Sequence, residues 1–195
     1  FLDQNTGFAT LANGKIMKTI NGGLVWSQYN TPYDLNTIAF ANSTTGVAAG
    51  DWGAVMRTTN GGSSWEYQQV GGNIPLKSVW FTDNNTGFIT GTSGILRKTT
   101  NAGLNWNITI PLNTTVELCA IRFPNPSTGI ITGGSGVVLK TTDAGDSWIV
   151  NYTENYNKLN SAAFADANTV FAVGDAGSIV KSTNTGTSWN LSSIG

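Results

Sequence analysis

The 195-residue sequence contains no histidine and only one cysteine. Without histidine, Ser-His-Asp and Cys-His catalytic arrangements are excluded, and the commonest zinc ligand is missing. A single cysteine cannot form a disulfide within the chain, so the cysteine content does not indicate a compartment. Cys119 lies in the apolar run Leu118-Cys119-Ala120-Ile121, which predicts a small core residue rather than a reactive thiol.

Charged residues and long apolar runs are also scarce. Eleven acidic and ten basic residues give a net charge of -1, so the chain has no basic field to attract nucleic acid or an anionic membrane. No apolar run approaches the length of about 18 residues that insertion into a membrane as a helix requires, and neither a signal peptide nor a cofactor motif is recognised. Asn, Thr, Ser and Gly supply most of the polarity while helix-forming residues are sparse, which is typical of an all-β protein.

What the sequence does contain is one eight-residue motif in five copies. Each copy has Ser or Thr, any residue, Asn or Asp, any residue, Gly, two further residues and Trp. Successive Trp residues are 39 to 42 positions apart, and a constant motif at near-constant spacing indicates repeated structural units. The Asn or Asp, Gly and Trp residues of the five copies are Asn21, Gly23, Trp26, Asn60, Gly62, Trp65, Asn101, Gly103, Trp106, Asp143, Gly145, Trp148, Asn184, Gly186 and Trp189.

The motif has the chemistry of a tight hairpin. Its Asn or Asp side chain is expected to accept hydrogen bonds from backbone amides two residues on, its Gly to supply a positive φ, and its Trp to fold over the turn as a hydrophobic plug. A metal site is not favoured, because only Asp143 among the five acidic or amide residues is a carboxylate. The basic residue before each motif is expected at a solvated strand position: Lys18, Arg57, Lys98, Lys140 and Lys181.

Around the motif, each repeat predicts four short antiparallel strands. In the second repeat these are a strand ending at Phe40, a small-residue strand at 47–50, a third at 54–58 and a fourth beginning at Trp65. The sequence therefore predicts an all-β protein, a β-propeller of four-stranded antiparallel blades forming one domain over residues 1–195. The repeats are approximately 1–33, 34–74, 75–115, 116–157 and 158–195.

The number of blades stays open. The first repeat lacks its first strand, because Phe1 aligns with the last residue of that strand in the other repeats. Propellers usually have about 4 to 8 blades. Either the chain forms a five-bladed ring missing one strand, or it is a portion of a larger ring that neighbouring chains or domains complete. We favour the larger ring.

The motif closely resembles the Asp-box, or bacterial neuraminidase repeat. The combined pattern of Phe-x-Asp/Asn-x-x-Thr-Gly, Gly-x-apolar-x-Lys/Arg-Thr and Thr-Asn-Gly-Gly-x-x-Trp resembles the photosystem II assembly factor type of propeller repeat. Similar repeats are common in secreted, multidomain bacterial surface proteins. The resemblance implies a β-propeller whose box is a structural hairpin between the third and fourth strands of a blade, away from the ligand face, and a secreted or cell-surface location.

Candidate ligand-binding residues lie on the opposite face, where the loops between second and third strands meet the loops between blades. Trp52 is the foremost candidate, because it occupies a hairpin tip where the other repeats carry small or polar residues. It can stack on a sugar face or a peptide side chain, or it can pack on neighbouring loops. The candidate residues are Tyr33, Asp34, Asp51, Trp52, Glu117, Tyr156 and Asp175.

The predicted function is a non-catalytic, extracytoplasmic binding or scaffold propeller that recognises protein or glycan through its loop face, as a module of a surface or adhesin-like protein. One alternative is a glycoside hydrolase of the Asp-box type, with Asp34, Asp51, Glu117 or Asp175 as an acid/base pair. Sialidases need three converging arginines, which Arg57, Arg97 and Arg122 are not expected to provide. The other alternative is an assembly factor that holds a membrane-protein segment, although that family's arginine-rich patch is not matched.

Overall fold

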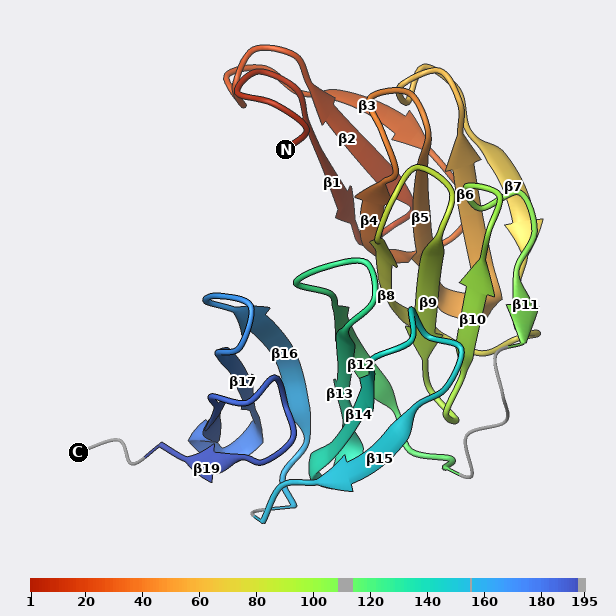
Figure 1. Cartoon of the computed structure of the whole chain (residues 1–195). Helices are drawn as coiled ribbons and strands as arrows, with labels where there is room; N and C mark the ends of the chain where they lie inside the picture. Colours follow the sequence, from red (N-terminus) through yellow and green to blue (C-terminus); the bar gives the residue numbers. More distant parts are fainter. Residues whose placement is uncertain (109–113, 155, 193–195) are drawn as a thin grey trace. The chain divides into compact units, whose positions relative to one another are not determined.

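The structure, a computed structural model, describes residues 1–108, 114–154 and 156–192 (Figure 1). These residues form five antiparallel β-sheets and contain no α-helix. In this part of the chain no helix has the length and apolarity needed to cross a membrane. The prediction of an all-β fold with four-stranded antiparallel units is confirmed.

Each sheet is a meander in which consecutive strands pair side by side. The first sheet contains β1 (Gly7–Leu11), β2 (Lys15–Thr19) and β3 (Ser27–Asn30). The second contains β4 (Leu35–Phe40), β5 (Gly46–Gly50), β6 (Ala54–Thr58) and β7 (Glu66–Gln69). The third contains β8 (Leu76–Phe81), β9 (Gly87–Gly91), β10 (Leu96–Thr99) and β11 (Asn107–Ile108). The fourth contains β12 (Leu118–Arg122), β13 (Gly129–Gly133), β14 (Val137–Thr141) and β15 (Ile149–Tyr152). The fifth contains β16 (Leu159–Phe164), β17 (Val170–Gly174), β18 (Ile179–Ser182) and β19 (Asn190–Leu191).

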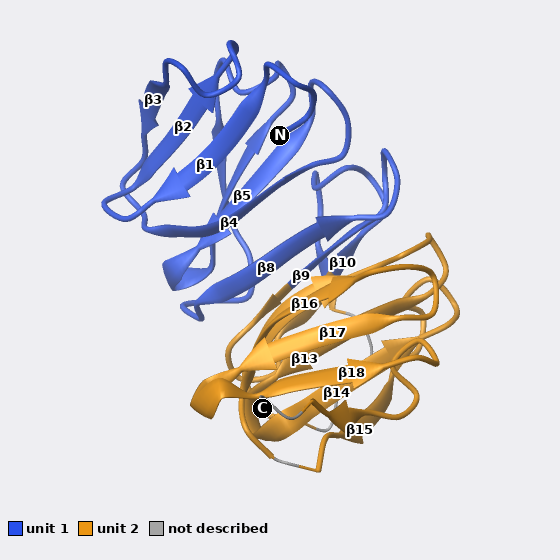
Figure 2. Ribbon diagram, turned by 90° about the vertical axis from the view of Figure 1, so that its left-hand side faces the viewer, with its two compact units in different colours: residues 1–89, 98–107 blue, residues 90–97, 108–195 orange. Residues whose placement is uncertain are grey.

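The chain divides into two compact units, shown in different colours in Figure 2. Unit 1 contains residues 1–89 and 98–107, and unit 2 contains residues 90–97 and 108–195. Unit 1 therefore holds the first and second sheets, unit 2 holds the fourth and fifth, and the boundary passes through the third. Each unit has its own packed core.

The cores form where neighbouring sheets pack face to face. In unit 1, Ile16 of β2 packs in one cluster with Leu35 of β4 and Met56 of β6. In unit 2, Ile130 of β13 packs with Val170 of β17. The second strands of the three middle sheets are the most enclosed, since every residue of β5, β9 and β13 is buried. Their many Gly, Ala and Thr residues suit this close approach of one sheet to the next.

In each of the first four sheets a Phe ring lies close to a Gly and makes a T-shaped or tilted contact with the Trp of the box. In the second sheet, a Cβ atom on Gly46 would lie 2.7 Å from the Phe40 ring, so only glycine fits beneath that ring. Phe40 also makes a T-shaped contact with Trp65, with 6.1 Å between ring centroids and planes at 82°. Trp65 is only 6% exposed, as expected of a hydrophobic plug.

The turn between the first and second strands is closed by an Asp or Asn side chain. In the second sheet, Asn42 Oδ1 accepts the N–H groups of Thr44 and Thr45 at 3.0 and 2.9 Å. Equivalent pairs of bonds are made by Asp3, Asp83, Asn125 and Asp166. These two N–H bonds explain the Asp/Asn of the Phe-x-Asp/Asn-x-x-Thr-Gly pattern.

The eight-residue motif forms the same hydrogen-bonded hairpin in every sheet, between the third and fourth strands. In the second sheet the Thr58 hydroxyl accepts the N–H groups of Asn60 and Gly62 at 3.3 and 2.9 Å. It also donates to Asn60 Oδ1 at 3.0 Å, and that oxygen accepts the N–H of Ser64 at 2.9 Å. The same four bonds recur around Thr19, Thr99, Thr141 and Ser182.

This bonding corrects one detail of the sequence prediction. The amide two residues after Asn60, that of Gly62, bonds to the Thr58 hydroxyl, while the Asn60 side chain accepts from Ser64, four residues on. The reason is the backbone, because Gly61 and Gly62 both have positive φ, 64° and 76°. Two successive left-handed residues turn the chain back so that the later amide faces the Asn side chain.

Three of the five basic residues that precede a box are bonded to the protein, whereas all five were predicted as solvated side chains. Lys18 Nζ donates to Gly61 O, in the box of the next sheet, at 2.7 Å. Arg57 Nε likewise donates to Ala102 O at 2.9 Å. In unit 2, Lys140 Nζ donates to Asn184 O at 3.3 Å and to the Thr187 hydroxyl at 2.6 Å. These three side chains therefore hold the first, second and fourth sheets to the box of the next sheet.

Cys119 is half-buried rather than fully buried, which corrects the prediction of a core residue. It lies on β12 where the pairing with β13 shifts register between Leu118 and Ala120. The extra residue at such a bulge turns its side chain away from the regular inward alternation.

The contact between sheets can be tested at Lys18. We expect Lys18→Met to lower the free energy of unfolding by about 1–3 kcal/mol, because the variant loses a charge-assisted bond and leaves the Gly61 carbonyl without this donor. Urea denaturation followed by circular dichroism measures the change. Lys15→Met, at the end of β2 away from the box, is the matched control and is expected to change stability little. Equal effects of the two substitutions would contradict the role of the Lys18 bond.

The fourth box provides a pH test, because it alone has a carboxylate, Asp143, at the Asn position. Hydrogen bonds from the Ser147 hydroxyl and N–H lower the pKa of Asp143 to about 2. A lowered pKa in the folded state means that ionised Asp143 stabilises the fold above its unfolded pKa of 3.8, and that this stabilisation is lost as the pH falls toward 2.

We therefore expect the melting temperature of Asp143→Asn to fall less than that of the wild type when the pH is lowered from about 5 to about 2. The two proteins should melt at similar temperatures near neutral pH, because the other four boxes show that Asn makes the same bonds to the box backbone. If the melting temperature of the variant falls as much on acidification as that of the wild type, Asp143 does not contribute to the pH dependence of stability.

Candidate functional site

Trp52 occupies a strained turn between β5 and β6. It is the central residue of the 3-10 helix η1 (Asp51–Gly53), with φ 59° and ψ 21°. The following Gly53 also has positive φ, and a Cβ atom there would lie 2.0 Å from Gly72 O. A left-handed conformation costs an ordinary L-residue about 1–2 kcal/mol, and for a bulky side chain it is unusual.

The other repeats show that this conformation belongs to the turn and not to the tryptophan. The equivalent residues all have positive φ: Asn13, Ser93, Ser135 and Ala176. All four are small or suited to the left-handed region, whereas Trp52 is neither. Trp52 is also 64% exposed, so burial in the core does not compensate for its strain.

Two tyrosines and a glutamine lie beside this turn in unit 1. The rings of Tyr33 and Tyr67 are stacked, with centroids 4.8 Å apart and planes at 13°. The Tyr67 hydroxyl bonds to Gln69 Oε1, and Gln69 Nε2 donates to Trp52 O at 2.6 Å and to Gly72 O at 2.8 Å. Hydrogen bonding with Tyr33 raises the pKa of Tyr67 above its usual value, so the Tyr67 phenol is neutral near pH 7. We call Tyr33, Trp52, Tyr67 and Gln69 the aromatic cluster.

Asp34 and Asp51, predicted beside Trp52, are tied to the loops around them. Asp34 Oδ1 accepts the N–H groups of Asn13 and Gly14 at 2.6 and 3.2 Å. The Asp34 carbonyl accepts the N–H of Asp51 at 2.9 Å, and Asp51 Oδ1 accepts from Asn36 Nδ2 at 2.9 Å. Both carboxylates are therefore hydrogen-bonded to neighbouring loop or strand residues.

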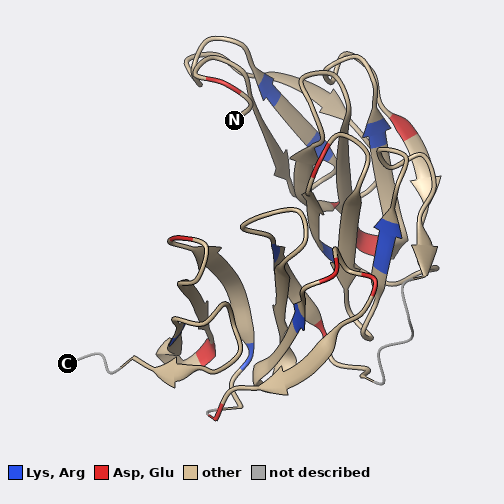
Figure 3. Cartoon of the chain, viewed as in Figure 1, with Lys and Arg blue, Asp and Glu red and all other residues tan. Residues whose placement is uncertain are grey.

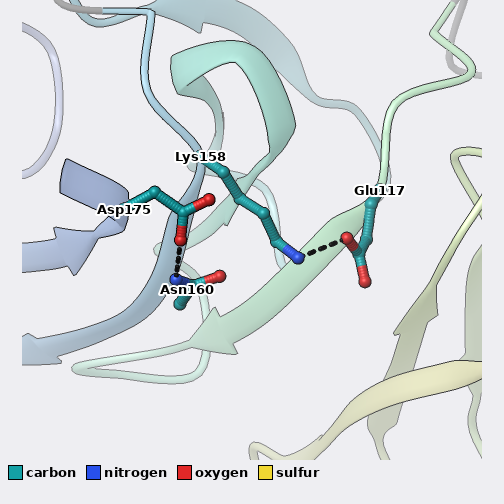
Figure 4. Close-up of polar contacts among 4 residues, drawn as sticks. All are labelled: Glu117, Lys158, Asn160 and Asp175. Carbon is teal, nitrogen blue, oxygen red and sulfur yellow. Dashed lines mark hydrogen bonds and ion pairs between the residues drawn. The ribbon is translucent and has the colours of Figure 1, made fainter.

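In unit 2 the predicted acidic residues have similar partners, as Figure 4 shows. Glu117 and Lys158 form an ion pair with 2.6 Å between Oε2 and Nζ. This bond to Glu117 is the main reason that the pKa of Lys158 is raised. Asp175 Oδ1 accepts from Asn160 Nδ2 at 2.7 Å, which repeats the pairing of Asp51 with Asn36.

The structure thus groups the predicted residues by unit. Unit 1 brings Tyr33, Asp34, Asp51 and Trp52 to one loop region, and unit 2 brings Glu117 and Asp175 to either side of Lys158. Tyr156, also in unit 2, is 68% exposed with φ 51°. Whether these residues bind a ligand stays a prediction.

Tyr67 and Gln69 were missed by sequence reasoning. They lie on β7, two positions apart, so their side chains share one face of the strand. That alternation was a usable signal, but nothing in the sequence shows that the end of β7 lies beside the turn that holds Trp52.

Each of the three arginines donates to a backbone carbonyl. Arg57 donates to the next box, while Arg97 and Arg122 each donate to the carbonyl of the residue before them, at 3.1 and 2.7 Å. Burial lowers the pKa of both Arg97 and Arg122. Figure 3 marks the Lys and Arg positions in blue along the ribbon of several strands. Among the residues described, no three of His, Cys, Asp and Glu lie together as metal ligands would.

Five meander sheets with one box hairpin each define an Asp-box β-propeller. The family described as photosynthesis system II assembly factor YCF48 matches residues 29–116 and, in an overlapping match, residues 68–151, together more than half of the chain. The chain therefore belongs to this family, and the predicted resemblance is confirmed. Comparison with curated protein sequences gives no match.

Solved propellers have similar folds. YCF48 bound to D1 peptide matches with a TM-score of 0.51 and 18% identity over 98% of this chain and 78% of that chain. YCF48 from Cyanidioschyzon merolae matches with a TM-score of 0.69 and 14% identity, over 91% of this chain and 63% of that chain. An ancestral GH74 enzyme matches with a TM-score of 0.79 and 16% identity, over 97% of this chain and 30% of that chain. At these identities the likeness shows the β-propeller fold, and the chain spans only part of each of these proteins.

The role of Asp34 can be tested by substitution. We expect Asp34→Ala to lower the free energy of unfolding by about 1–2 kcal/mol, because the N–H groups of Asn13 and Gly14 lose their acceptor. Asp34→Asn keeps Oδ1 and should retain most of the stability. Urea denaturation distinguishes the two. If neither variant is destabilised, Asp34 does not order the turn.

Proposed function

We propose that this chain is a non-catalytic binding propeller that holds an extended protein segment on the aromatic cluster of unit 1, with Trp52 as the anchor. Trp52 carries this assignment, because it is exposed in a backbone conformation that disfavours a bulky side chain. Neither core packing nor turn geometry accounts for a tryptophan there. Exposed aromatic side chains of this kind are typical anchors of binding surfaces.

The neighbours of Trp52 favour binding by a preformed surface. Gln69 bonds to the backbone on both sides of the turn, through Trp52 O and Gly72 O, and to the Tyr67 hydroxyl. Tyr67 is 44% exposed and supported from behind by its stacked partner Tyr33. A ligand would therefore meet aromatic surfaces that lose little freedom on binding.

Family membership supports a protein partner. A YCF48 structure contains a bound D1 peptide, so a propeller of this family can hold a peptide. The chain has only three arginines, and each is bonded to a backbone carbonyl. We therefore expect recognition by aromatic contact and backbone hydrogen bonds, not by an arginine-rich patch.

A glycoside hydrolase is the second candidate, because a GH74 enzyme shares the fold. The carboxylates of unit 1 argue against a hydrolase, because Asp34 is hydrogen-bonded to turn amides and Asp51 is hydrogen-bonded to Asn36. A hydrolase needs two carboxylates available to the substrate and its water. Aromatic surfaces also suit sugar rings, so glycan binding without catalysis is included in the test below.

We also propose an extracytoplasmic location, in line with the resemblance to repeats of secreted bacterial surface proteins. Protease added to intact cells of the source organism should degrade the protein, while a cytoplasmic enzyme in the same cells stays intact. Protection of both proteins would disprove this location.

The binding proposal is tested by replacing Trp52 with the residue found at the equivalent turn of the first sheet. Phage-displayed peptides are selected on the wild-type chain, and the affinity of an enriched peptide is measured by calorimetry. We expect Trp52→Asn to weaken binding by at least about tenfold. The same substitution should leave the melting temperature unchanged or raised, because Asn tolerates the left-handed conformation.

Ser93→Asn, at the equivalent turn of the third sheet, is the matched control and should leave the affinity unchanged. Loss of melting temperature in Trp52→Asn together with unchanged affinity would show that Trp52 is a packing residue and would reject the proposal. A different outcome is that no peptide is enriched, while a xyloglucan oligosaccharide binds the wild type and not Trp52→Asn. That result would mean that the ligand is a glycan and not a protein.

A further inference from the structure

The outer strand of the fourth sheet, β15, has one side that is open to a further strand. In the part of the chain that the structure describes, β15 pairs with β14 and with no other strand. An edge strand directs about half of its backbone N–H and C=O groups away from its neighbour. An extended chain can therefore bond to β15 along this side.

The side chains of β15 do not discourage such pairing. Natural edge strands usually carry charges, prolines or bulges that prevent it. The fourth strands β3 and β7 have the same length as β15 and the sequences Ser-Gln-Tyr-Asn and Glu-Tyr-Gln-Gln. β15 is instead Ile-Val-Asn-Tyr, with no charged residue and no proline. Its residues Ile149, Val150 and Tyr152 are 65%, 37% and 55% exposed, so packing in the core does not account for them.

A pocket lies beside β15 on one face of the sheet, within unit 2. Its volume is about 290 Å³, and its walls include Lys140, Ile149 and Asn151 of the fourth sheet and Thr187 of the fifth box. Ile149 and Asn151 share this face because side chains alternate along a strand. Lys140 lies directly opposite Ile149 in the pairing of β14 with β15. A residue added opposite Ile149 would therefore extend its side chain toward the pocket.

Lys140 brings a positive charge to this pocket without an acidic partner. Its Nζ donates to Asn184 O and to the Thr187 hydroxyl, which are both uncharged. Among the residues described, no Asp or Glu forms an ion pair with Lys140, and the carboxylate of Asp143 bonds to the Ser147 hydroxyl. Burial lowers the pKa of Lys140, since desolvation disfavours the charged form. A carboxylate that entered the pocket would stabilise the ammonium.

The second sheet shows where such a carboxylate can come from. Its basic residue Arg57 lies opposite Glu66 of the outer strand β7. At the same place in the fourth sheet, Lys140 lies opposite Ile149. The fourth sheet thus lacks the acidic residue that the second sheet carries on its own edge.

We propose that an extended segment of a protein partner adds to β15 as a fifth, antiparallel strand and places an Asp or Glu side chain in the pocket of Lys140. The residues on either side of this acidic residue are apolar and lie on the other face of the sheet, with Val150 and Tyr152. Neighbouring strands are about 4.8 Å apart, so the added strand is about 10 Å from β14, which a lysine and an acidic side chain span together. The site uses no residue of the aromatic cluster.

The test uses the Trp52→Asn chain, so that the aromatic cluster does not contribute to binding. Short displayed peptides are selected on this protein, and an enriched peptide is titrated by calorimetry. We expect enriched peptides to carry an Asp or Glu between apolar residues, and replacement of that residue by Lys to weaken binding by at least about tenfold. Hydrogen exchange of β15 amides should become slower when the peptide binds, because the added strand bonds to their outward N–H groups.

Ile149→Glu, introduced into the same chain, places an acidic residue opposite Lys140, as Glu66 lies opposite Arg57 in the second sheet. We expect this variant to fold and to bind the peptide at least about tenfold more weakly, because the carboxylate occupies the pocket and repels the ligand. Ser27→Glu, at the same position of the first sheet, is the matched control and should leave the affinity unchanged.

Three results would overturn the proposal: no peptide is enriched, an enriched peptide leaves the exchange of β15 unchanged, or Ile149→Glu binds the peptide as tightly as its parent. Exchange in β15 that slows with rising protein concentration and without peptide would show that a second copy occupies the edge, and would also reject an acidic partner. Because Trp52 is replaced in every protein tested, none of these results decides the proposed function of the aromatic cluster.

Discussion

The fold depends on one side-chain hydroxyl per repeat, that of the Ser or Thr that opens each box. It accepts two backbone N–H groups and donates to the Asn or Asp side chain, so it fixes the hairpin between the third and fourth strands. The hairpin in turn presents a carbonyl, such as Gly61 O, to the basic residue of the preceding sheet. Each such bond contributes only about 1 kcal/mol, but together these bonds place the box carbonyls that Lys18, Arg57 and Lys140 bind. Stability in such a repeat array is the sum of the sheets and their neighbouring contacts.

At the other end of the strands, polar groups support the loops and aromatic groups stay exposed. Asp34 closes the turn after β1, Asp51 binds Asn36, and Glu117 pairs with Lys158. A carboxylate that is already bonded to neighbouring protein groups in this way is less available to act as a general acid or base. The exposed surface of the loop region in unit 1 is instead that of Trp52 and Tyr67. This division of roles favours binding over catalysis.

The sequence was sufficient for the parts of the structure that local chemistry decides. The box, the turns with positive φ and the four-strand pattern each depend on residues within about ten positions, and they repeat five times in register. The bond from Lys18 to Gly61 spans 43 positions, so a single repeat gives no sign of it, and the side chain was taken for a solvated one. Tyr67 and Gln69 were missed for the same reason, because only folding brings the end of β7 beside Trp52. The half-burial of Cys119 was unpredictable, because the bulge in β12 has no clear sequence signal.

The box and the turn that carries Trp52 lie at opposite ends of the second sheet, because β6 begins at that turn and ends at the box. The box residues bond to one another and to Lys18 of the first sheet, so they are occupied with holding the hairpin and its neighbour in place. A ligand on the aromatic cluster would contact only the loop end of the sheet. A substitution at Trp52 can therefore change binding without altering the hydrogen bonds of the box.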